Sequence, residues 1–236
     1  MSMPKVKAKK RVTKSVKTKP VHVVFILDET GSMLRVKDST ISGFNEYLET
    51  LQNDKNANTH KMSFLTFNSR GVRRRELFTN LKAVEKLNHQ SYNPAANTPL
   101  YDAIGEGLAG IDLDSKHDIL VVIQTDGEEN SSVRETRDSI FRKIEEAKKA
   151  GWGFVFLGAD QDAWGAAQLI GIPRGSTMSY DNTAQGIQGA MTDTERATVR
   201  YMNSTAEQRN QLRASFLSGD ENQGLDLRRD VNAPNS

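Results

Sequence analysis

Five side chains whose only polar atoms are oxygens stand where predicted strands end or a predicted helix begins. Asp28, Thr30 and Ser32 occupy alternate positions in the stretch FILDETGSM, directly after an apolar run. Thr98 stands at a predicted helix entrance, and Asp126 follows a second apolar run. Two carboxylates and three hydroxyls suit a hard cation such as Mg²⁺, which prefers oxygen ligands in octahedral geometry. We therefore expect these five residues to hold one Mg²⁺, with Mn²⁺ as the alternative ion.

The charges of this residue set predict what the ion would do. Two aspartates balance a double positive charge, whereas the hydroxyls add ligands without adding charge, so the ion stays electrophilic. An ion with an open coordination position attracts an incoming carboxylate, and the attraction grows as water leaves the interface. We expect the flanking Glu29, Glu128 and Glu129 to be solvated rim residues that select a partner electrostatically.

The elements that must position these residues are predicted from the hydrophobic pattern. From residue 21 onward, short apolar runs alternate with segments of helical period, which is typical of βαβ units around a largely parallel sheet. The predicted fold class is α/β, a doubly wound, Rossmann-like, mostly parallel six-stranded sheet flanked by helices, with a C-terminal helical extension. The predicted strands cover 21–27, 60–68, 72–78, 117–124, 152–158 and 176–181, and the predicted helices cover 39–52, 100–111, 134–150 and 161–171. Ligands of such sheets bind beyond the carboxyl ends of the strands.

The chain is expected to contain one domain with flanking segments. Residues 1–20 form a basic arm, predicted to be flexible, with eight basic and no acidic residues, so the remainder of the chain is acidic. The domain covers 21–181, the helical extension covers 182–217, and a polar tail covers 218–236. Within the extension, capping-box patterns at Thr192 with Glu195 and at Ser204 with Glu207 predict one broken or two consecutive helices.

Composition excludes several kinds of chemistry. The chain has no cysteine, which rules out disulfides, zinc ribbons, iron–sulfur clusters and thiol catalysis. No apolar run follows the lysines of the basic arm, and nowhere do roughly 18 consecutive apolar residues occur, so neither a signal peptide nor a membrane span is predicted.

Taken together, the oxygen-bearing residues resemble the metal-ion-dependent adhesion site (MIDAS) of von Willebrand factor type A (VWA) domains, which reads D-x-S-x-S, then threonine, then aspartate. Asp28, Thr30 and Ser32 match the first element, with threonine in place of the usual first serine. Thr98 matches the second element and Asp126 the third. The resemblance implies that Thr30, Ser32 and sometimes Thr98 ligate the ion directly, whereas Asp28 and Asp126 act largely through water.

The resemblance covers about residues 21–181, and the stretch DSTISGFNEYL is similar to intracellular bacterial or phage members of the family. It implies a non-enzymatic module that captures an aspartate or glutamate of another protein within a bacterial or phage assembly. The implied location is the cytoplasm of a bacterial or phage-infected cell, or association with a virion.

Two alternatives remain open. DETGS also resembles the D-K-T-G-T motif of phosphoaspartyl hydrolases of the haloacid dehalogenase type, in which Asp28 would be the nucleophile and Asp126 a magnesium ligand. Against this, Asn130 stands where those enzymes carry a second acid, and no convincing lysine motif lies between. The second alternative is contact with nucleic acid or an anionic surface through residues 1–19.

A G-x-G-x-x-G pattern at Gly105, Gly107 and Gly110 invites a dinucleotide-binding interpretation. That motif must follow a strand and open a helix. These glycines instead lie inside a predicted helix, so we expect them to allow close packing of that helix on the sheet.

Overall fold

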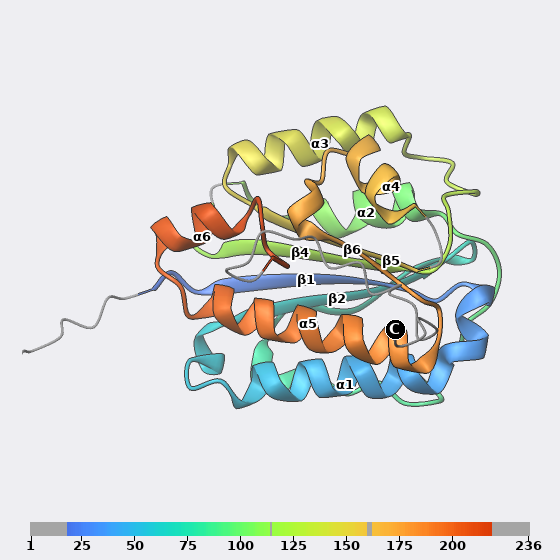
Figure 1. Cartoon of the computed structure of the whole chain (residues 1–236), viewed down its shortest axis with the longest axis horizontal. Coiled ribbons are helices and arrows are strands. Elements are labelled where there is room, and N and C mark those ends of the chain that lie inside the picture. The colour runs from blue at the N-terminus through green and yellow to red at the C-terminus, as the bar shows by residue number, and fades with distance from the viewer. Residues whose placement is uncertain (1–17, 114, 160–161, 219–236) are drawn as a thin grey trace, which may run out of the picture.

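The computed structural model describes residues 18–113, 115–159 and 162–218, and its strands form one six-stranded sheet (Figure 1). The strand order is β3-β2-β1-β4-β5-β6, and every neighbouring pair is parallel except β2 with β3. The strands are β1 (Val21–Asp28), β2 (Lys61–Asn68), β3 (Gly71–Asn80), β4 (Asp118–Thr125), β5 (Gly153–Ala159) and β6 (Thr177–Tyr180). The predicted α/β fold class is confirmed. Most of the predicted arm and tail lies outside the described residues.

Helices cover both faces of the sheet, with α1 and α5 on one side and α2, α3 and α4 on the other (Figure 1). The helices are α1 (Lys37–Asn53), α2 (Leu100–Leu108), α3 (Arg137–Lys149), α4 (Ala163–Leu169), α5 (Ala184–Met202) and α6 (Ala206–Leu212). Short 3₁₀ turns occupy 31–36, 57–59, 81–83 and 174–176. Across the described ranges, none of these helices has both the length and the apolar character needed to cross a bilayer.

The alternation of side chains along β1 explains why the sheet has two cores. All eight residues of β1 are buried. Phe25 and Leu27 belong to the core under α1 and α5, whereas Val24 and Ile26 belong to the core under α2, α3 and α4. Because β1 is paired in parallel with both β2 and β4, the carboxyl ends of the three strands lie side by side. Loops that leave these ends are therefore held close together.

Gly107 allows the close packing on the sheet that was expected of all three glycines, whereas Gly105 faces the Glu135 side chain and Gly110 lies beyond the end of α2. A Cβ atom at Gly107 would lie 2.5 Å from Cδ1 of Ile26, so a larger side chain would require Ile26 or the helix to shift. Glycine at this position thus lets the helix lie close to the sheet.

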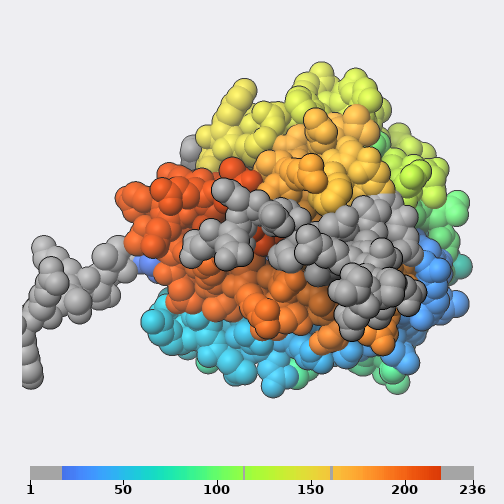
Figure 2. All heavy atoms as spheres, in the orientation of Figure 1, coloured from blue at the N-terminus to red at the C-terminus, as the bar shows by residue number. Residues whose placement is uncertain are grey.

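The C-terminal helices are built into the domain. Helix α5 packs beside α1 (Figure 2) and contributes Ile187, Met191 and Tyr201 to the core that contains Phe25. The capping boxes predicted in this region were wrong. Helix α5 is continuous and is capped by Thr183, and the second capping box is at Thr205 with Gln208.

The capping box predicted at Thr192 is absent because the Thr192 hydroxyl bonds to its own helix instead. The hydroxyl of Thr192 donates to the carbonyl oxygen of Gln188, 2.8 Å away, as threonines inside helices often do. A threonine followed three residues later by glutamate therefore does not by itself mark a helix start.

A buried histidine predicts acid destabilisation of the fold. His22 is 2% exposed, and burial, with smaller contributions from His117 and Lys61, lowers its pKa from 6.5 to about 4. Between these values the unfolded chain binds a proton that the folded chain does not, so stability falls as pH falls through this window. We expect the wild type to lose about 2 kcal/mol more than His22→Gln between about pH 7.5 and about pH 5 in urea unfolding.

The exposed His89, whose side chain is 68% accessible, provides the control. The variant His89→Gln should keep the acid destabilisation of the wild type. A His22→Gln protein with an unchanged dependence on pH would contradict the assignment to His22.

Candidate metal centre

The ends of β1 and β4 and the entrance of α2 meet at one edge of the sheet, and the predicted oxygen ligands gather there. The hydroxyl of Ser32 donates to Oδ1 of Asp126 over 2.6 Å, and its oxygen lies 3.2 Å from Oγ1 of Thr30. The side chain of Thr98 lies against Gly127, the residue that follows Asp126. A Cβ atom added at Gly127 would stand only 2.9 Å from Thr98 Oγ1. Three loops far apart in the sequence thus deliver their side chains to one place.

Asp28 is fixed at the centre of this arrangement. The backbone N–H of Thr30 donates to Oδ1 of Asp28 over 2.7 Å, closing a turn that ends β1. The hydroxyl of Thr125 donates to Oδ2 over 2.6 Å, and the Tyr92 hydroxyl donates to the Asp28 carbonyl oxygen over 2.6 Å. Each carboxylate oxygen therefore accepts a hydrogen bond, and the side chain is 0% exposed.

The two carboxylates lie where negative charge is poorly stabilised. Burial raises the pKa of Asp28 to about 7, against the opposing effect of its hydrogen bonds from Thr125 and Thr30. Burial also raises the pKa of Asp126, although Ser32 and Asn182 donate to it. A bound cation would supply the compensating charge that the surroundings lack, so the donor set fits a divalent ion.

The hydroxyl geometry also fits an octahedral ion. Two adjacent ligands about 2.1 Å from Mg²⁺ stand about 3.0 Å apart, close to the 3.2 Å between the Thr30 and Ser32 oxygens. Among residues 18–113, 115–159 and 162–218, no three His, Asp or Glu side chains gather as a metal site. Ion binding would thus depend on hydroxyl oxygens. Ser32 is exposed whereas Thr30 and Thr98 are buried, so the centre opens on the Ser32 side.

Glu29 is not a rim residue, which corrects the prediction from the sequence. Its side chain is 0% exposed, and both carboxylate oxygens lie 3.3 Å from Nη2 of Arg75. Its Oε1 also accepts the N–H of Asn93 over 2.5 Å. Glu29 thus ties β3 and the loop before α2 to the end of β1.

The other two predicted rim glutamates differ from each other. Glu128 is exposed, so its role at the rim stays a prediction. Glu129 is half-buried, and its carboxylate accepts the backbone N–H groups of Tyr101, Ser131 and Ser132. The Glu129 carboxylate is therefore committed to holding its own loop against α2, which does not fit a partner-selecting role.

Two residues of the centre escaped the sequence-based prediction. Thr125 holds Asp28, and Nδ2 of Asn182 donates to Oδ2 of Asp126 over 2.6 Å. Asn182 lies two residues beyond the end of β6, so a polar residue just past a strand end is a signal that could have indicated it. Together these residues orient both carboxylates.

Comparisons with known proteins establish the fold. No family model matches the sequence, and no curated protein matches it. The structure is similar to the pilus adhesin SpaC from Lactobacillus rhamnosus GG in its open conformation, with 16% identity and a TM-score of 0.61. That match covers 79% of this chain but only 31% of SpaC. At such identity the likeness concerns the fold alone.

Two further matches share the VWA-like fold. One is the vWF domain of the type V pili tip protein Mfa5 from Porphyromonas gingivalis, with 12% identity, a TM-score of 0.54, and coverage of 75% of this chain and 95% of that one. The other is proximal thread matrix protein 1 (PTMP1) from the mussel byssus with a zinc-occupied MIDAS motif, with 10% identity, a TM-score of 0.53, and coverage of 74% and 47%. These pilus and byssus proteins lend no support to a cytoplasmic location, which stays a prediction.

Proposed function

We propose that this chain is a non-enzymatic VWA-type module in which one Mg²⁺, or Mn²⁺, captures an aspartate or glutamate side chain of a partner protein. The observation that carries the proposal is the contact from Thr30 through Ser32 to Asp126, beside the buried Asp28. Thr30, Ser32 and Thr98 would ligate the ion, and Asp28 and Asp126 would act through water. The bound ion supplies positive charge and an open position for the partner's carboxylate.

The chain's own residues determine how a partner would approach. Because Ser32 is exposed and Thr30 and Thr98 are buried, the partner's carboxylate would enter from the side of residues 31–36. Leu34, 63% exposed, and the exposed Glu128 lie on the loops beside that entrance and would select the partner's neighbouring residues. The zinc-occupied MIDAS motif of PTMP1 supports a divalent cation in this kind of fold.

The family type and the setting belong to the same proposal. The stretch DSTISGFNEYL supports an intracellular bacterial or phage module that works within an assembly, in the cytoplasm or on a virion. Residues 1–19 would add a contact with nucleic acid or an anionic surface through their lysines.

The hydrolase alternative receives less support from the geometry. A nucleophilic aspartate must present one carboxylate oxygen to its substrate. In Asp28 both oxygens accept hydrogen bonds, from Thr30 and Thr125, and the side chain is 0% exposed. A role in orienting water or ligand around an ion fits this environment better than nucleophilic attack.

Partner capture tests the proposed function. The immobilised chain should retain a host protein in Mg²⁺, release it in chelator, and fail to retain it when Asp126 is replaced by alanine. Asp138→Ala, on the exposed face of α3 with 75% of its side chain accessible, is the matched control and should capture normally. Capture that is indifferent to both chelator and Asp126→Ala would refute a metal-dependent module.

A further inference from the structure

A cavity remote from the metal centre has the features of a small-molecule binding site. We propose that it binds a small neutral molecule with an apolar body and one carbonyl oxygen. The cavity surrounds His22, near the start of β1, whereas the metal centre lies at the other end of that strand. Six residues of extended chain separate His22 from Asp28, which places the two sites about 20 Å apart. This inference is independent of the proposed metal-dependent function.

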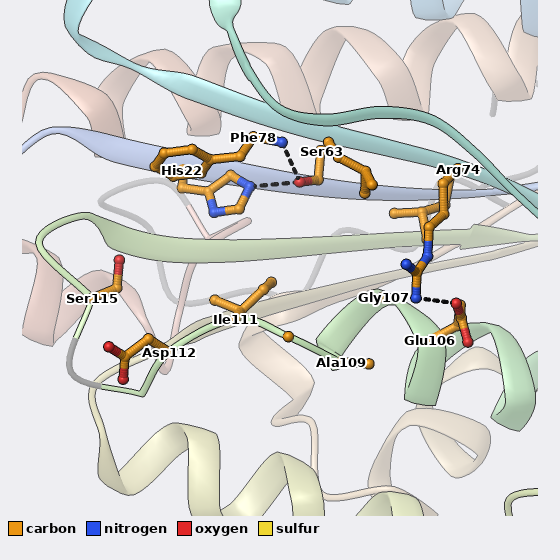
Figure 3. Close-up of a pocket in the computed structure, with 13 residues that line it drawn as sticks. His22, Ser63, Arg74, Phe78, Glu106, Gly107, Ala109, Ile111, Asp112 and Ser115 are labelled. Carbon is orange, nitrogen blue, oxygen red and sulfur yellow. Dashed lines mark hydrogen bonds and ion pairs between the residues drawn. The ribbon is translucent and has the colours of Figure 1, made fainter.

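The cavity has the size of a small-molecule site. It has a volume of about 410 Å³, in the lower part of the range of roughly 300–1,000 Å³ usual for ligand pockets. It lies between β1 to β3 and the end of α2 with the loop that follows (Figure 3). Apolar walls are provided by Leu65, Leu77, Phe78 and Ile111.

An unpartnered nitrogen on a buried ring points into this space. His22 is 2% exposed, and in the described part of the chain its Nδ1 has no hydrogen-bond partner. Figure 3 shows the ring with Nε2 directed to Ser63 and Nδ1, itself covered, on the side of the ring that faces Ile111. A buried polar atom of this kind is unfavourable unless something supplies its partner.

The hydrogen bonds around Ser63 are compatible with a proton on that nitrogen. Oγ of Ser63 accepts the backbone N–H of Phe78 over 3.0 Å and lies 2.8 Å from Nε2 of His22. The hydroxyl of Ser63 can donate its own proton to Nε2, and in that tautomer the ring proton lies on Nδ1. With the proton on Nδ1, the ligand atom that meets it is an acceptor, such as a carbonyl oxygen.

The wall opposite is shaped by an irregular piece of sheet. The pairing of β2 with β3 shifts register on both sides of Phe64, and Phe78 adopts a left-handed φ of 48°. Its ring stands edge-on to His22 with 5.0 Å between centroids and remains 48% exposed. Bulges of this kind re-aim side chains. Here the bulge presents an aromatic wall beside the Nδ1 donor, which suits an apolar ligand body.

The charged groups at the cavity argue for a neutral ligand. Arg74 and Glu106 both line it and are ion-paired with each other, so neither offers an uncompensated charge. Asp112 also lines the cavity and brings no positive charge to it. A carboxylate or phosphate is therefore a poorer occupant than an amide, ketone or similar neutral carbonyl compound.

Benzamide and toluene form a matched pair of probes, since both carry the same ring and only benzamide has an acceptor oxygen. We expect benzamide to shift the ¹⁵N signal of the His22 imidazole in a saturable way and to bind roughly tenfold more tightly than toluene. In His22→Phe this preference should disappear. The comparison of the two probes in the wild type needs no variant, so it stands even if His22→Phe does not fold.

Three outcomes would overturn the site. These are the absence of a saturable shift up to the solubility limit of benzamide, equal affinities for the two probes in the wild type, and an ordered water on Nδ1 that benzamide does not displace. Since neither probe contacts the carboxyl edge of the sheet, any of these results leaves the metal-dependent module untouched.

Discussion

Replacing Asp28 by asparagine is expected to weaken Mg²⁺ binding about 100-fold. Asp28 supplies one of the two carboxylates of the centre, and both of its oxygens are oriented by hydrogen bonds from Thr30 and Thr125. The substitution keeps the size of the side chain but removes a negative charge from a buried site, where charge interacts strongly with an ion. Isothermal titration calorimetry with Mg²⁺ measures the change, and Mn²⁺ titration followed by electron paramagnetic resonance gives an independent value.

The same variant separates a binding defect from a folding defect. Asparagine can still accept the N–H of Thr30 and can still pair with the Thr125 hydroxyl, so urea unfolding in chelator should show a folded protein. Asp138→Asn changes the charge of the chain equally at an exposed position of α3 and should bind Mg²⁺ like the wild type. A folded Asp28→Asn protein with wild-type affinity for Mg²⁺ would remove Asp28 from the centre.

The parts of the fold that follow from local patterns were predictable. Every residue of β1 and β4 is buried on one face of the sheet or the other, so both strands appear in the sequence as continuous apolar runs. The residue at which a helix begins is harder to predict, because it also depends on the conformation of the preceding loop. Helix α1 begins at Lys37, two residues before the predicted start, since the 3₁₀ turn of residues 31–36 leads straight into it.

The centre was predictable only where its residues form a motif. Asp28, Thr30 and Ser32 stand at alternate positions of one short stretch, so their chemistry is visible in the sequence. The buried ion pair of Glu29 with Arg75 depends on how β2 and β3 are paired, and the bond from Asn182 to Asp126 joins residues 56 positions apart. A glutamate beside an aspartate looks like a surface charge until its partner across the sheet is known.

The burial of a charged residue near the C-terminus was equally difficult to predict from the sequence. Arg209 lies in the polar stretch AEQRNQL of α6, and arginine is rarely fully buried unless it is paired. Its side chain is nevertheless 0% exposed and donates to Oδ2 of Asp118 over 2.7 Å. It also donates to the carbonyl oxygens of Lys19, Tyr201 and Met202. One guanidinium thus joins α6, the end of α5, the start of β4 and the residues that precede β1.

Replacing Arg209 by methionine is therefore expected to destabilise the fold by about 3–5 kcal/mol. Methionine can fill the space, but it leaves Asp118, which is 7% exposed, with Arg213 as its one remaining ion-pair partner in the described part of the chain. Urea unfolding measures the loss. Adding Asp118→Asn to Arg209→Met should restore part of the stability, because the buried charge without its main partner is then removed.

An exposed ion pair on the neighbouring helix provides the control for how much burial contributes to the loss of stability in Arg209→Met. Arg196 on α5 lies 3.6 Å from Asp193 and is 74% exposed, so Arg196→Met should cost no more than about 1 kcal/mol. The two substitutions remove the same kind of charge from adjacent helices, and they differ in solvent access and in the number of carbonyl oxygens left without a donor. Equal losses for Arg209→Met and Arg196→Met would mean that α6 is held to the domain by its apolar contacts rather than by this guanidinium.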